Sequence, residues 1–80
     1  MPQKQDCAEF GKLIRKLRKK KGLTQEVFAD EAGLDVSYIG RIERGQVNLG
    51  LTIIYQIAAA LKISPRKLLK NSVSHRSGSD

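Results

Sequence analysis

Two arginines in the segment 36–44 have the residue type and spacing to contact nucleic acid. If this segment is helical, one of its faces carries no acidic residue and, apart from the arginines, only small or polar side chains: Val36, Ser37, Gly40, Arg41 and Arg44. A helix enters the major groove of DNA where its leading face is uncrowded, and arginine pairs bidentately with the O6 and N7 atoms of guanine. The pattern therefore favours a DNA-recognition helix.

Gly40 lies in the middle of the same segment. Glycine inside a helix costs about 1 kcal/mol relative to alanine. A close approach of the backbone to DNA would explain this residue, and so would a neutral substitution. Both interpretations stay open on the sequence.

A second pair of charged residues lies at the margins of two predicted apolar stripes. Arg18 follows Ile14 by four residues, and Glu43 follows Ile39 by four, so each flanks the buried face of its helix. A guanidinium and a carboxylate in these positions should form a bidentate pair that braces one helix against the other. We expect the pair to determine geometry, because desolvation offsets much of its attraction.

The chain offers little material for catalysis or metal binding. It has one histidine, His75, and one cysteine, Cys7, which cannot form a metal cluster or a disulfide framework. No glycine-rich phosphate loop, signal-peptide pattern or membrane-length apolar stretch is present. We therefore expect a cytoplasmic protein that is not an enzyme and has no metal, cofactor or small-molecule ligand.

The charge of the 80-residue chain is distributed in blocks. The net charge is +7, with eight basic and two acidic residues in 1–22, and four acids without a base in 23–40. Basic residues gathered in this way suggest an electrostatic surface for a polyanion. The plainer interpretation is that the lysines of 12–20 solvate the outer face of a helix.

Apolar periodicity and capping residues predict five helices and no strand. We expect them over 8–20, 24–32, 36–44 and 51–62, with a short fifth helix from Pro65 capped by Ser64. Thr24 and Asp35 are the caps expected for the second and third helices, which only residues 33–35 separate, and this is an α-turn-α unit. The prediction is an all-α domain over 8–70, with a flexible N-terminus over 1–7 and a disordered tail over 71–80.

The order of residues within this unit resembles a known family. The following runs look like the phage-repressor (Cro/CI, or XRE) helix-turn-helix family: Thr24–Ala29, Ala32–Leu34, Tyr38–Ile39 and Arg41–Gly45, followed by Ile57–Leu61 and Ile63–Pro65. The resemblance covers about residues 8–70. It implies a compact five-helix, lambda-repressor-like DNA-binding domain that acts as a homodimer on pseudo-palindromic operators of double-stranded DNA.

The resemblance also implies roles for individual residues. It places Gln25 against a phosphate at the start of the second helix, and it assigns base-edge contacts to Val36, Ser37 and Arg41. The resemblance implies contacts with the DNA backbone for Arg44, Gln46 and Asn48. Thr24 and Tyr38 complete the expected DNA-binding set. Without the motif, Gln25 would be taken for a solvated surface residue.

Within the family, the short length and a set of residues are similar to the controller proteins of restriction–modification systems: Leu34, Asp35, Tyr38, Ile39, Ile42, Glu43, Arg44 and Asn48. Those proteins are dimers that regulate their own gene and the endonuclease gene. The chain departs from them at Val36, where they often carry a basic or polar reader, and at Val47 in the loop. Val36 could still contact a thymine methyl group.

Two further hypotheses concern partners. We expect the apolar residues late in the chain to exceed what one small core can hide, and they form the candidate dimer interface: Tyr55, Ile63, Leu68 and Leu69. Burial of all four within one protomer is the alternative. An alternative function is that of a DNA-binding antitoxin whose main partner is a protein toxin, because the same fold serves that class.

Overall fold

The computed structural model describes residues 4–69, and within that range it contains helices joined by short loops and no strand. The helices are α1 (Lys4–Lys20), α2 (Gln25–Ala32), α3 (Val36–Glu43) and α4 (Leu51–Leu61), and a further helical segment covers 65–69. The all-α, five-helix prediction is therefore confirmed. The predicted tail 71–80, with His75, lies outside the described residues.

Two predicted boundaries are corrected. α1 begins at Lys4 rather than Ala8, so residues 4–7, which were expected to be flexible, are helical. The reason is tertiary, because Cys7 and Ala8 lie against the loop that follows α3. α3 ends at Glu43, and Arg44 occupies the cap position after it.

The caps of the helix-turn-helix unit form mostly as expected. The Thr24 hydroxyl accepts a hydrogen bond from the Val27 N–H at 3.1 Å, and Gly33 adopts the left-handed conformation (φ +71°) that ends α2. Ser64 likewise accepts from the Lys67 N–H at 3.1 Å. Asp35 occupies the cap position of α3, but its carboxylate accepts from the Ser37 hydroxyl and not from a backbone N–H.

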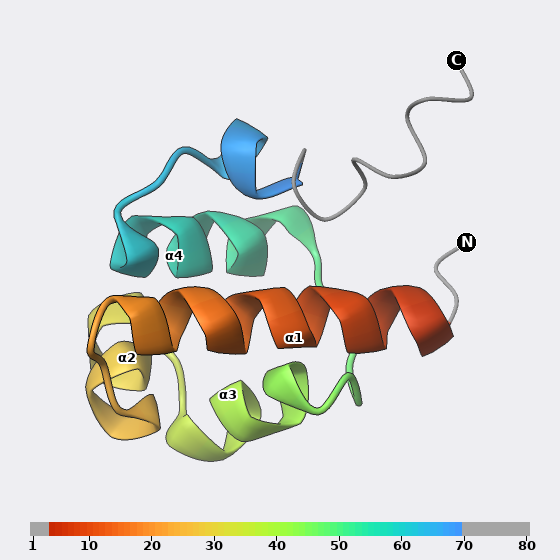
Figure 1. Ribbon diagram of the computed structural model, residues 1–80, viewed down its shortest axis with the longest axis horizontal. Helices are drawn as coiled ribbons and strands as arrows, with labels where there is room; N and C mark the ends of the chain where they lie inside the picture. Colours follow the sequence, from red (N-terminus) through yellow and green to blue (C-terminus); the bar gives the residue numbers. More distant parts are fainter. Residues whose placement is uncertain (1–3, 70–80) are drawn as a thin grey trace.

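The core is drawn from every helix. It contains fully buried side chains from α1, α2, α3, α4 and the segment 65–69: Ile14, Phe28, Ile39, Ile42, Ile57, Leu61 and Leu68. α1 packs against α3, and α2 packs against both α3 and α4. Figure 1 shows α1 crossing the molecule between α3 and α4, with α2 near its C-terminal end.

α1 and α3 meet at the level of their backbones. A Cβ atom at Gly11 would overlap the carbonyl oxygen of Ile42 and lie 2.7 Å from that of Glu43. A Cβ atom at Gly45, in the loop after α3, would lie 2.6 Å from the Cα atom of Ala8, which lies about one turn before Gly11 in α1. The two glycines therefore permit a close crossing that holds α3 and the loop after it against α1, and the position of Gly11 in the sequence does not signal this role.

Candidate DNA-binding interface

The outer face of α3 is exposed and carries the predicted contact residues. Val36 is 40% exposed, and Ser37, Arg41 and Arg44 are exposed as well. Within the described residues, Arg41 has no ion pair, so its guanidinium keeps its donors for a partner. Tyr38 is half-buried at the edge of the core.

Two short-range hydrogen bonds orient side chains next to this face. The Ser37 hydroxyl donates to Asp35, and the Arg44 Nε donates to the Gln46 Oε1 at 3.3 Å. The second bond brings together two of the predicted backbone-contact residues. Because Gln46 uses its carbonyl oxygen as the acceptor, its amide N–H groups remain available to an anion.

The loop after α3 is tied to α1 by a contact that sequence reasoning missed. The Cys7 thiol donates to the Asn48 Oδ1 at 2.9 Å, although the residues are 41 positions apart. Asn48 therefore points its carbonyl oxygen at α1 and leaves its amide N–H groups for other acceptors. No local pattern signals this contact, because it depends on how α1 crosses α3.

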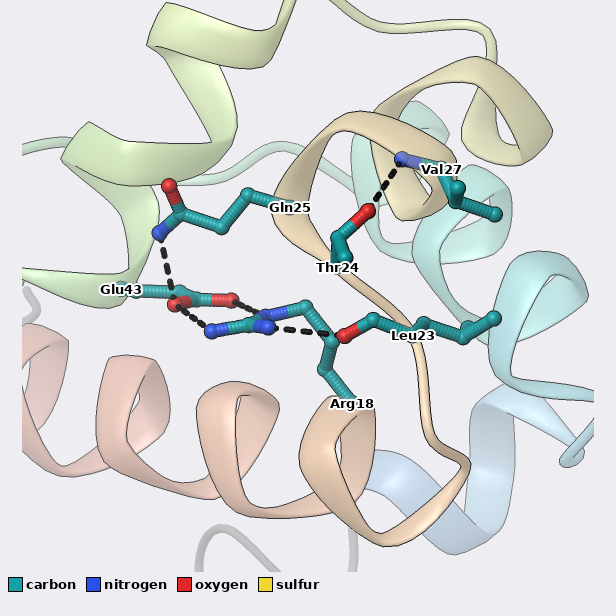
Figure 2. Close-up of polar contacts among 6 residues, drawn as sticks. All are labelled: Arg18, Leu23, Thr24, Gln25, Val27 and Glu43. Atoms are coloured by element: carbon teal, nitrogen blue, oxygen red, sulfur yellow. Dashed lines mark hydrogen bonds and ion pairs between the residues drawn. The ribbon is translucent and has the colours of Figure 1, made fainter.

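The predicted pair between Arg18 and Glu43 forms and is buried. The Arg18 Nε and Nη2 donate to the two carboxylate oxygens of Glu43 at 2.6 and 3.1 Å, and the Arg18 Nη1 donates to the Leu23 carbonyl oxygen at 2.8 Å. The side chains of Arg18 and Glu43 are only 9% and 3% exposed. Figure 2 shows the guanidinium lying between Glu43 and the Leu23 carbonyl group. The pair joins the end of α3 to α1 in a fixed geometry.

Gln25, the predicted phosphate contact, joins the same cluster. Its Nε2 donates to the Glu43 Oε1 at 3.0 Å, so the carboxylate contacts both α1 and α2 (Figure 2). The side chain is partly buried, which is more than a solvated surface glutamine would be. One amide N–H is engaged in this bond, and the second N–H and the carbonyl oxygen remain.

Comparison with known protein families agrees with this helix-turn-helix geometry. The family model described as "Helix-turn-helix" matches residues 14–68, which span α2, the turn at 33–35 and α3. The chain belongs to the XRE-type helix-turn-helix family. This helix-turn-helix protein is therefore a DNA-binding transcriptional regulator, and the family is not enzymatic.

Several relatives of this helix-turn-helix protein are controller proteins. The crystal structure of the restriction-modification controller protein C.AhdI from Aeromonas hydrophila is 50% identical, with a TM-score of 0.77 over 80% of this chain and 97% of that chain. Control protein C.BamHI of Bacillus amyloliquefaciens is 41% identical over 61 residues, covering 75% of each chain. The uncharacterized HTH-type transcriptional regulator YazB of Bacillus subtilis is 46% identical over 59 residues, covering 74% of this chain and 86% of the relative. None of these three is described as an antitoxin, so that alternative gains no support from them.

The candidate dimer residues of this helix-turn-helix protein separate into three groups. Tyr55 is 55% exposed on α4, and Ile63 and Leu69 are half-buried. Leu68 is fully buried in the core of its own protomer and has no surface to offer a partner, which corrects its inclusion. Leu51, one turn before Tyr55 on α4, is 61% exposed as well.

No helix within residues 4–69 is both long and apolar enough to cross a membrane. In the same part of the chain, no group of three or more histidine, cysteine, aspartate or glutamate residues is placed to hold a metal ion.

Proposed function

We propose that this protein is a controller-type transcriptional regulator that binds a pseudo-palindromic operator as a homodimer and acts in the cytoplasm, where its DNA lies. The observation that carries the proposal is the outer face of α3. It presents Arg41, which has no ion pair within the described residues, beside the exposed Val36 and Ser37, on a helix joined to α1 by the buried Arg18–Glu43 pair. The similarity to controller proteins supports the same function.

The proposed binding mode lays α3 in the major groove. Arg41 pairs with a guanine, Ser37 bonds to a base edge, and Val36 packs against a thymine methyl group. Backbone phosphates flank this contact and accept hydrogen bonds from the surrounding side chains: Thr24, Gln25, Tyr38, Arg44, Gln46 and Asn48. Lysines on the exposed face of α1 add attraction that does not depend on base sequence.

The proposed dimer uses the exposed apolar surface of α4. Leu51 and Tyr55 stand one turn apart on this helix and are both more than half exposed. Ile63 and Leu69 are partly buried, and their remaining surfaces would extend the contact. A two-fold interface would bury these side chains and place two α3 helices on successive major grooves of one operator.

Selection of bound duplexes from a random pool tests the function directly. We expect an inverted repeat whose half-sites lie about 34–36 Å apart, one turn of B-DNA. Sedimentation at micromolar protein concentration should show a dimer, alone or on the selected duplex. A single asymmetric motif bound by a monomer would contradict the two-half-site mode, and failure to enrich any motif would contradict sequence-specific binding.

A further inference from the structure

The Glu43 carboxylate is the point at which three helices meet. Glu43 lies in the last turn of α3, its oxygens accept from Arg18 of α1, and its Oε1 also accepts from Gln25, the first residue of α2. The Arg18 Nη1 extends the cluster to the Leu23 carbonyl oxygen just before α2 (Figure 2). One buried carboxylate thus connects α3 to the start of α2, where a phosphate contact is proposed.

The bond from Gln25 is not needed to satisfy Glu43. Arg18 already donates to both carboxylate oxygens, at 2.6 and 3.1 Å. In the described residues, every buried side-chain nitrogen or oxygen has a hydrogen-bond partner. The consequence of the additional bond therefore concerns Gln25, whose amide group it orients.

A primary amide held by one N–H has a defined orientation. Because the Gln25 Nε2 faces Glu43, the amide cannot rotate to exchange its nitrogen and oxygen without losing this bond. Its second N–H remains available to an acceptor, and a phosphate oxygen accepts hydrogen bonds but cannot donate one. Holding the side chain also removes part of the rotamer entropy that would otherwise be lost on binding.

We propose that Glu43 is a positioning residue for the DNA interface, which orients the Gln25 amide so that its second N–H donates to a backbone phosphate. The inference rests on the proposed function. Since Glu43 belongs to α3, the phosphate contact at the start of α2 and the base-reading helix have a fixed relative position. Binding of the phosphate then constrains how α3 lies in the groove.

Replacement of single phosphates tests this role. The duplex selected from the random pool is prepared with a neutral methylphosphonate at one position at a time, and binding of each is measured. With wild-type protein, one methylphosphonate should weaken binding about tenfold, the effect of losing a hydrogen bond to a charged group. The Gln25→Ala variant should have lost its sensitivity to that one position.

Glu43→Gln is the decisive variant. It leaves one acceptor oxygen for Arg18 and Gln25 together and places an NH2 group against a donor. We expect binding of the unmodified duplex to weaken about tenfold, with sensitivity lost at the same phosphate, and the double variant with Gln25→Ala to bind no more weakly than either single variant. Glu31→Gln, an exposed residue of α2 outside the cluster, is the matched control and should behave as wild type.

Two results distinguish failure of this inference from failure of the proposed function. If a folded Glu43→Gln protein keeps the wild-type phosphate sensitivity and its effect adds to that of Gln25→Ala, Glu43 acts on the fold alone and the inference is overturned. If wild-type protein selects no duplex, the proposed function falls, and this inference falls with it.

If the Glu43→Gln variant does not fold, a measurement on wild-type protein tests the proposal instead. The two side-chain N–H protons of Gln25 give separate nuclear magnetic resonance signals. We expect the proton bonded to Glu43 to exchange slowly with solvent and to keep its position when the selected duplex is added, while the other proton shifts. Loss of the Glu43-bonded signal on DNA binding would overturn the proposal, because Gln25 would then leave Glu43 to reach the DNA.

Discussion

The inner face of α3 is buried against the rest of the molecule, whereas its outer face is exposed. On the inner face, Ile39, Ile42 and Glu43 are buried, and the carboxylate of Glu43 has three donors around it. On the outer face, Val36 is 40% exposed and Arg41 has no ion pair within the described residues. The polar groups that orient α3 are thus paired and buried, whereas Arg41, the proposed reader of DNA, is exposed and has no ion pair within the described residues.

The largest effect should follow the loss of the inner carboxylate. Glu43→Ala leaves the Arg18 guanidinium buried without its counter-charge, and we expect the free energy of unfolding to fall by about 3–5 kcal/mol. Thermal or urea unfolding followed by circular dichroism measures this loss. Glu31→Ala, an exposed glutamate on α2, is the control and should stay within about 0.5 kcal/mol. An unchanged Glu43→Ala melting curve would show that the pair does not hold α3.

The crossing of α1 and α3 offers a second way to disturb the inner face. Gly11→Ala places a methyl group against the backbone carbonyl groups of Ile42 and Glu43, so the two helices must separate. We expect a loss of about 1–3 kcal/mol in unfolding free energy, although alanine is the better helix former. A gain in stability, measured by the same unfolding experiment, would contradict the close crossing.

Arg41→Ala should leave the fold unchanged and weaken recognition. We expect a cost of about 1–3 kcal/mol against the preferred duplex and relaxed selectivity at one base position. The change in unfolding free energy should remain below about 0.5 kcal/mol, because the side chain is exposed. Binding to preferred and scrambled duplexes measures the discrimination, with exposed Arg66→Ala as the control. Unaltered discrimination would remove Arg41 from the reading residues.

The smallest effect concerns Gly40, which was expected on the exposed face of α3 but is buried. Its added Cβ would contact only the end of the flexible Arg44 side chain, at 3.2 Å. We therefore expect Gly40→Ala to raise the unfolding free energy by about 0.5–1 kcal/mol. Duplex affinity then distinguishes the two explanations of this glycine. Weaker binding indicates close approach of the backbone to DNA, and unchanged binding indicates a neutral substitution. A loss of stability would show that the Arg44 side chain does not move aside for the added methyl group.

Much of the fold could be predicted because its signals are local. Thr24, Gly33 and Ser64 cap their helices as expected, and each acts within about four residues of its own position. The Arg18–Glu43 pair was also predictable, since both residues flank an apolar stripe. Asp35 was predicted less well, because the nearby Ser37 hydroxyl competes for its carboxylate.

By itself, the sequence determined the order of the helices, the helix-turn-helix unit and the exposure of Val36, Ser37 and Arg41 on α3, because periodicity and capping depend on near neighbours. Gly40, expected on the same exposed face, is buried. Only the tertiary structure decided that Gln25 bonds to Glu43, that Cys7 holds Asn48, and that Leu68 belongs to the core of one protomer. These contacts depend on the distances and angles at which helices cross. A crossing as close as that at Gly11 is set by packing of the whole core, and no spacing along the chain reports it.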